Sequence, residues 1–119
     1  NNNYRFYRVA EAYLNAAELL LETGGDAGLA KDYVNKIRRR AGIAELGAVT
    51  LDDVINERHL EFVGEGKRYF DLVRTGKAAT VLVPDSYGYR TNSWTESKKY
   101  IPIAQAELDS DPALVQNNY

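Results

Sequence analysis

The sequence predicts a mainly α-helical chain: a tightly joined helical hairpin, further short helices, and a C-terminal segment of loop and short strand. Apolar side chains recur at helical spacing through residues 7–41, with one interruption at two adjacent glycines. Two shorter amphipathic stretches follow within residues 50–76. Beyond Pro84 the helical period is lost and Gly, Asn, Ser and Thr become frequent, a composition typical of loops.

The first predicted helix runs from about Tyr7 to Thr23. Its expected apolar face consists of Val9, Ala12, Tyr13, Ala16 and Leu20. Its expected opposite face is polar and consists of Glu11, Asn15, Glu18 and Glu22. Gly24 and Gly25 are expected to end this helix, because glycine readily adopts the left-handed cap conformation.

The second predicted helix runs from about Ala27 to Ala41, with Asp26 as its N-cap and Gly42 as its stop. Its expected apolar stripe consists of Ala30, Tyr33, Val34, Ile37 and Ala41. The side chains expected to face outward are Lys31, Asp32, Asn35, Lys36, Arg38 and Arg39. The two helices and their short turn resemble one tetratricopeptide unit, which cannot bury its concave face alone, so we expect further sequence upstream.

A third helix is predicted to open at Thr50, its N-cap, and a fourth to run from about Lys67 to Thr75. The third helix carries Leu51, Val54, Ile55, Arg58 and Phe62 along one face, and the fourth has Tyr69, Phe70, Leu72 and Val73 to bury. Gly64 and Gly66 lie between these two predicted helices and are expected to separate them. Residues 85–99 are predicted to form a loop, Tyr100–Ile103 a short edge strand, and Gln105–Asp109 a helical stub.

Composition excludes several functional classes. The chain has 119 residues, enough for one domain, and its 15 basic and 17 acidic residues give a net charge of −2, which offers no bulk attraction for nucleic acid. There is no Cys and only one His, so no thiolate or His-rich metal site is expected, and no cofactor is implied. No apolar run approaches the roughly 20 residues that span a bilayer. The Asn1–Tyr4 start reads as a cut inside a longer protein, with any export signal or lipid-bearing Cys upstream.

Four blocks carry a resemblance to a known family. The longest is ERHLEFVGEGKRYFDLVRTG at residues 57–76, which is similar to the signature of the SusD/RagB family. RVAEAYLNAAE at residues 8–18, VNKIRRRAG at residues 34–42 and YIPIAQAEL at residues 100–108 resemble further segments of the family in the same order. Gly64, Thr75 and Ala104 depart from the family's pattern. The blocks cover nearly the whole chain, which resembles the C-terminal region of family members several hundred residues long.

The resemblance implies a fold, a function and a location. It implies that residues 1–119 belong to the C-terminal region of a SusD-like helical domain with tetratricopeptide-like helix pairs. It also implies a cell-surface, outer-membrane lipoprotein, attached to the membrane only through an upstream lipid anchor. Such proteins bind an oligosaccharide or polysaccharide, act with a SusC-like TonB-dependent transporter, and are not enzymes.

The bend between the third and fourth predicted helices is rich in charge. Glu57, Glu61 and Glu65 follow one another at four-residue spacing and would repel each other if unpaired. Arginine can bind a carboxylate through two hydrogen bonds. We therefore expect a structural ion-pair network that fastens this bend and consists of Glu57, Arg58, Glu61, Glu65, Arg68, Asp71 and Arg74.

The predicted loop of residues 85–99 holds the best candidates for ligand binding. Tyr87, Tyr89 and Trp94 could stack on the apolar face of a sugar ring, and Arg90 or Asn92 could bond its hydroxyl groups. The alternative is that the three rings cover the helical core beneath a long loop. In the family the known glycan contacts come largely from other parts of the chain.

Four other patterns have a functional and a structural interpretation. Glu57 and Glu61 could form an acid/base pair of a glycoside hydrolase, although the neighbouring arginines favour the structural network. His59 could bind a metal, but it has no partner at ligand spacing. Arg38, Arg39 and Arg40 could bind an anion or simply end a helix. The helix pair with Tyr7, Tyr13 and Tyr33 could present a groove to a protein partner or form core.

Three functions remain open from the sequence. The first is glycan binding in an outer-membrane uptake system with reversible capture and no bond broken. The second is a tetratricopeptide-like adaptor that binds a protein through its helix pair and has no enzymatic activity. The third and weakest is a carbohydrate-active enzyme that uses Glu57 and Glu61.

Overall fold

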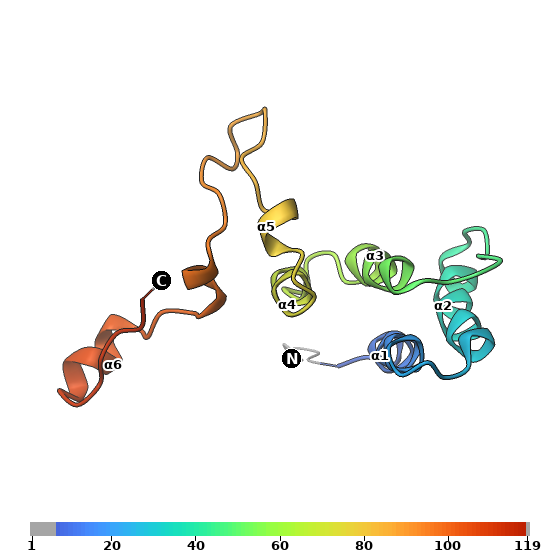
Figure 1. Ribbon diagram of the computed structural model, residues 1–119, viewed down its shortest axis with the longest axis horizontal. Helices are drawn as coiled ribbons and strands as arrows, with labels where there is room; N and C mark the ends of the chain where they lie inside the picture. Colours follow the sequence, from blue (N-terminus) through green and yellow to red (C-terminus); the bar gives the residue numbers. More distant parts are fainter. Residues whose placement is uncertain (1–6, 119) are drawn as a thin grey trace, which may run out of the picture. The chain divides into compact units, whose positions relative to one another are not determined.

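The computed structural model describes residues 7–118 and is mainly helical, as predicted (Figure 1). The Asn1–Tyr4 segment interpreted above lies outside the described residues. The helices are α1 (Val9–Glu22), α2 (Ala27–Ala41), α3 (Leu51–Glu61), α4 (Arg68–Arg74), α5 (Ala78–Val81) and α6 (Gln105–Ser110), and η1 (Glu96–Lys99) is a 3-10 turn. Within residues 7–118 no helix has the length and apolar character needed to cross a membrane.

The chain divides into two compact units, Asn1–Arg68 and Tyr69–Tyr119. In the first unit α1 packs against α2 and α3. The caps follow the predicted chemistry: the Asp26 carboxylate accepts a hydrogen bond from the Leu29 N–H at 3.0 Å, and Gly42 takes a φ of 72°. Thr50 and Asp53 form a reciprocal capping box at the start of α3.

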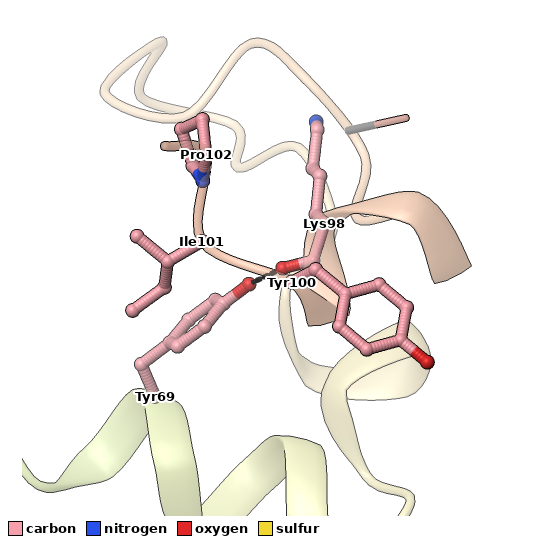
Figure 2. Close-up of a pocket in the computed structure, with 5 residues that line it drawn as sticks. All are labelled: Tyr69, Lys98, Tyr100, Ile101 and Pro102. Atoms are coloured by element: carbon pink, nitrogen blue, oxygen red, sulfur yellow. Dashed lines mark hydrogen bonds between the residues drawn. The ribbon is translucent and has the colours of Figure 1, made fainter. Parts of the chain in front are cut away.

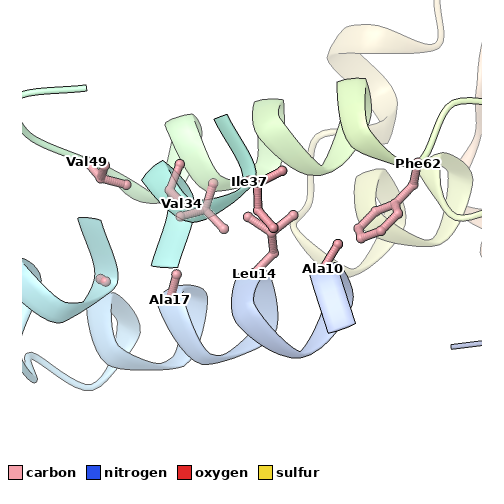
Figure 3. Close-up of a cluster of buried hydrophobic side chains, with 9 residues drawn as sticks. Ala10, Leu14, Ala17, Val34, Ile37, Val49 and Phe62 are labelled. Carbon is pink, nitrogen blue, oxygen red and sulfur yellow. The ribbon is translucent and has the colours of Figure 1, made fainter. Parts of the chain in front are cut away.

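The core of the first unit is small and made largely of aliphatic side chains (Figure 3). Leu14 and Val34 are fully buried where α1 meets α2, and Phe62 closes the core after α3. The cluster consists of Ala10, Leu14, Ala17, Ala30, Val34, Ile37, Val49, Val54 and Phe62. The predicted stripe of α2 is confirmed at Ala30, Val34 and Ile37, whereas Ala41 is exposed and Tyr33 only partly buried.

The predicted face of α1 is confirmed only in part: Tyr13 and Leu20 pack against the core, as expected. Val9 is 69% exposed and Ala12 is exposed, whereas Ala10, Leu14 and Ala17 are buried together with Glu11 and Glu18. Glu11 is tolerated inside because its carboxylate pairs with the Lys67 ammonium at 2.8 Å, which offsets the desolvation of the charge. Asn35 of α2, expected outside, is buried and bonds both the N–H and the C=O of Leu46.

In the second unit, two further predictions from the sequence are wrong. Leu72 of α4 is buried, but Phe70 is 56% exposed. Residues 100–103 form no strand: the N–H and C=O of Ile103 bond the side-chain amide of Gln116, each at 2.9 Å, where a neighbouring strand would otherwise bond them. Pro102 also lacks the N–H that a ladder requires. The stub at residue 105 is confirmed as α6, whereas α5 and η1 were not predicted.

Candidate functional site

The three glutamates of the predicted network all form ion pairs inside the first unit. Glu57 binds Arg38 at 2.7 Å. Glu61 binds Arg8 at 2.6 Å and Arg40 at 2.5 Å. Glu65 binds Arg8 at 2.7 Å. The arginines of these pairs come from the start of α1 and the last turn of α2, and the sequence analysis did not assign them to the network.

Arg8 is the centre of this cluster. Its Nε donates to both oxygens of Glu65, and its Nη2 donates to the Glu61 carbonyl at 2.8 Å. The hydrogen bond to Glu65 is the main reason that the pKa of Arg8 is raised; burial works in the opposite direction, and Glu61 adds to the rise. The Arg8 guanidinium also lies 4.9 Å from the Phe62 ring centroid, so the charge cluster is continuous with the core.

The three arginines named in the predicted network have different surroundings. Arg58 is buried and donates to the Asn15 amide oxygen at 2.5 Å. Arg74 binds Asp71 at 2.7 Å, three residues earlier in α4. Arg68 Nη1 is buried without a hydrogen-bond partner among the residues that the structure describes.

The alternative chemistries find little support in this geometry. Glu57 and Glu61 are each bound to a guanidinium group, which favours a structural role over acid/base catalysis. Arg39 pairs with Glu45 at 3.2 Å, so each of the three consecutive arginines of α2 is bound to a carboxylate. His59 is exposed, and residues 7–118 hold no group of three or more His, Asp or Glu side chains that could bind a metal ion.

The tyrosines of the helix pair contribute to packing. Tyr13 and Tyr33 are partly buried against the core, with ring centroids 5.4 Å apart. The Lys36 ammonium lies over both rings, 4.7 Å from the Tyr13 centroid and 5.6 Å from the Tyr33 centroid. Tyr7 is 77% exposed. These contacts favour the interpretation of Tyr13 and Tyr33 as core over that of a partner groove.

In the second unit, Asp85 organises the loop that carries the candidate ligand residues. Its carboxylate accepts hydrogen bonds from the backbone N–H groups of Tyr87, Tyr89 and Arg90, at 2.8, 3.2 and 2.6 Å. Desolvation is the largest single influence on the pKa of Asp85 and raises it, but the backbone donors together bring the pKa below its ordinary value. Gly88 provides the positive φ of 77° at the tip of this turn.

The five predicted ligand residues separate into two groups. Tyr87 and Tyr89 project from the turn, 83% and 92% exposed, with ring centroids 6.4 Å apart, so neither ring covers the core. Arg90, Asn92 and Trp94 line a common open cleft of about 270 Å³. The other residues that line this cleft are Tyr69, Leu82, Ser93 and Lys98.

Trp94 is half-buried and fixed at two points. Its N–H donates to the Leu82 carbonyl at 3.0 Å, and its indole Nε1 donates to the Tyr69 hydroxyl at 3.4 Å. The Tyr69 hydroxyl in turn donates to the Lys98 carbonyl. Arg90 Nη1 donates to the carbonyls of Val81 and Val83, so part of this guanidinium fastens the loop to α5.

A second pocket of the same unit, about 280 Å³, also borders Tyr69 and Lys98 (Figure 2). Its remaining wall consists of Tyr100, Ile101 and Pro102. The sequence predicted only that Tyr69 is buried on the fourth helix, and it did not place Tyr69 or Lys98 in the walls of these two pockets. The sequence feature that could have indicated this site is an aromatic residue at position 69 in addition to the aromatic residues of the loop that contains Trp94.

Comparison with known proteins identifies the family. A model of the SusD family matches residues 1–119. The starch-binding protein SusD of Bacteroides thetaiotaomicron is 34% identical over 93% of this chain and 20% of its own length. SusD-like protein P38 of Formosa agariphila is 32% identical over 98% of this chain and 24% of its own length.

Solved structures agree with these relatives. Surface glycan-binding protein A from Bacteroides uniformis is 67% identical, with a TM-score of 0.91 over 99% of this chain and 28% of its own. Surface glycan-binding protein A from Bacteroides thetaiotaomicron in complex with laminarihexaose is 62% identical, with a TM-score of 0.87 over 100% of this chain and 26% of its own.

The chain thus spans between a fifth and just over a quarter of the length of these relatives. The match to the family model extends over every residue of the chain, and the structural similarity to the solved relatives extends over nearly all of it. The chain belongs to the SusD family, whose members are carbohydrate-binding proteins and not enzymes.

Proposed function

We propose that the protein captures oligosaccharides at the cell surface, and that residues 1–119 form the C-terminal region of its SusD-like helical domain. The observation that carries this proposal is the 62% identity, over the whole chain, to a surface glycan-binding protein whose structure holds laminarihexaose. Capture is reversible and no bond is broken. The candidate contacts within this chain are Tyr87, Tyr89, Arg90, Asn92 and Trp94.

The two units suit different parts of this task. The first unit contributes ion pairs with little exposed carboxylate and a packed aliphatic core, which support a rigid frame. The second unit contributes exposed aromatic rings and polar side chains whose hydrogen-bonding groups are available to a ligand. Such groups bind the apolar faces and the hydroxyls of sugars.

The ligand proposed for the whole protein resembles laminarihexaose more than starch. The relative solved with laminarihexaose is 62% identical to this chain, whereas the starch-binding relative is 34% identical. The test is calorimetric titration of the full-length protein with laminarihexaose and, separately, with a starch hexasaccharide. We expect at least about tenfold tighter binding of laminarihexaose, a difference of about 1.4 kcal/mol. Absence of binding to both sugars would refute the proposal.

We further propose that the full-length protein is a lipid-anchored protein of the outer membrane and delivers its glycan to a SusC-like TonB-dependent transporter. This partnership is what the family resemblance implies. Affinity purification of the full-length protein from detergent-solubilised outer membranes tests it. A stoichiometric transporter in the purified complex is expected, and recovery of the protein without a transporter from these solubilised membranes contradicts the proposal.

A further inference from the structure

We infer that the cleft beside Trp94 is a subsite for one neutral sugar unit of a longer oligosaccharide, an inference that rests on the proposed function. The glycan contacts of the protein would then extend into the C-terminal unit, and Ser93 and Lys98 would join the candidate contact residues. The inference depends on three properties of the cleft: a fixed aromatic wall, uncommitted polar groups beside it, and its size.

The aromatic wall is held in place before any ligand arrives. The backbone N–H of Trp94 and its indole nitrogen are both bonded, to the Leu82 carbonyl and to the Tyr69 hydroxyl. The Tyr69 hydroxyl is itself bonded to the Lys98 carbonyl. Binding a sugar against this indole therefore costs little side-chain entropy, which is the main advantage of a preorganised site.

The polar groups around the indole suit sugar hydroxyls. Asn92 and Ser93 are exposed, and within residues 7–118 neither side chain takes part in a hydrogen bond. The Asn92 amide both donates and accepts, as does the Ser93 hydroxyl, and a sugar hydroxyl has the same dual character. Lys98 Nζ uses one donor on the Ser93 carbonyl at 2.8 Å, and an ammonium has three.

The size of the cleft limits what it can hold. Its volume of about 270 Å³ lies just below the range of roughly 300–1,000 Å³ that encloses a drug-sized ligand. A whole hexasaccharide does not fit, whereas one ring stacked on the indole does. The cleft therefore contributes one contact among several, and its loss is expected to weaken binding without abolishing it.

The test is titration of the full-length protein and its variants with laminarihexaose. Trp94→Ala is expected to weaken binding about fivefold and Trp94→Phe, which keeps an aromatic face, about twofold. The double variant Asn92→Ala/Ser93→Ala is expected to weaken binding about threefold, since it removes hydrogen-bonding groups but leaves the wall intact. Tyr7→Ala, a change of an exposed ring in the other unit, is the matched control and is expected to bind as the unchanged protein does.

Each outcome decides between the two proposals. Unaltered affinity in both Trp94→Ala and the Asn92/Ser93 double variant, while the unchanged protein binds, overturns the subsite and leaves the proposed function standing. If the unchanged protein binds neither laminarihexaose nor the starch hexasaccharide, the proposed function and the subsite are overturned together. Circular dichroism checks the fold of each variant, and if Trp94→Ala is unfolded, the double variant alone decides.

Discussion

Replacement of Glu61 by Gln removes the negative charge that pairs with Arg8 and Arg40 while keeping the size of the side chain. The Glu61 side chain is only 7% exposed and binds two guanidinium groups, those of Arg8 at 2.6 Å and Arg40 at 2.5 Å. A glutamine can accept a hydrogen bond from one of them but cannot balance two positive charges. We therefore expect Glu61→Gln to destabilise the first unit.

The expected loss of unfolding free energy depends on how deeply Glu61 and its two arginine partners are buried. Removing one partner of a fully buried ion pair costs about 3–5 kcal/mol, and an exposed pair contributes about 0–1 kcal/mol. The Glu61 side chain is only 7% exposed, but the Arg8 side chain is 26% exposed and that of Arg40 is 61% exposed, so water partly solvates both cations when the carboxylate is lost. The expected loss of unfolding free energy lies between the two limits, at about 2 kcal/mol.

The assay is urea unfolding of the full-length protein followed by circular dichroism, with Glu45→Gln as the matched control. Glu45 pairs with Arg39, also in the last turn of α2, but these side chains are 46% and 55% exposed. We expect Glu45→Gln to cost less than about 0.5 kcal/mol. Equal losses for the two variants would show that burial of Glu61 does not determine the strength of its ion pairs.

Three further changes test the remaining features of the first unit by the same unfolding assay. Leu14→Ala, at a fully buried position, is expected to cost about 2–5 kcal/mol, whereas Leu19→Ala, at a residue 61% exposed, is expected to cost less than about 1 kcal/mol. Asn35→Ala is expected to cost about 1–3 kcal/mol, because it leaves the N–H and C=O of Leu46 without their partners; a loss no larger than that of the exposed Asp32→Ala would contradict this. Thr50→Ala is expected to cost about 1 kcal/mol through loss of the cap. The hydrogen bonds from Thr50 lower the pKa of Asp53 from 3.8, so the stability they provide is present above that pH and is lost as the pH falls below it. The Thr50→Ala variant is expected to lose the part of this acid sensitivity that the Thr50 hydroxyl provides, whereas the backbone N–H of residue 50 still donates to Asp53. An unchanged dependence on pH below 4 would refute the assignment.

Local signals were sufficient to predict most helix boundaries. The bounds of α2 match the prediction because Asp26 and Gly42 mark its ends through backbone chemistry that depends only on neighbouring residues. The same is true of Thr50 at the start of α3. The short α5 and η1 lack both a cap with a side-chain hydrogen bond and an amphipathic period, and for that reason no pattern predicted them.

The face of α1 could be predicted only in part from hydrophobicity, because its inward side carries two carboxylates. Glu11 lies inside only because Lys67, 56 residues further along the chain, reaches its carboxylate. Hydrophobic periodicity treats every glutamate as solvent-facing. The inward face of α1 thus includes a carboxylate whose cation lies far along the chain, which a pattern confined to the helix does not reveal.

The charged bend shows the same difference between local and tertiary pairing. Asp71 and Arg74, three residues apart in one helix, form the pair that their spacing indicates. The glutamates of the bend instead bind arginines that lie between 19 and 57 residues away. The glutamates of the network could be predicted from the sequence, because like charges at helical spacing require partners. Their spacing carries no information on which cations pair with them.

The loop aromatics illustrate why composition identifies a candidate site without defining it. Tyr87, Tyr89 and Trp94 are all aromatic residues of one predicted loop, yet Trp94 lines the cleft of about 270 Å³ and the two tyrosines are not part of its wall. The difference arises from backbone bonds: Asp85 holds the two tyrosines on an exposed turn, whereas the bond from Trp94 N–H to the Leu82 carbonyl returns the chain toward α5. The indole is then within reach of Tyr69, 25 residues away, whose hydroxyl orients it. A sugar subsite built in this way depends on the path of the loop as much as on its aromatic residues, so a change that redirects residues 82–94 is expected to impair the cleft even when Trp94 itself is retained.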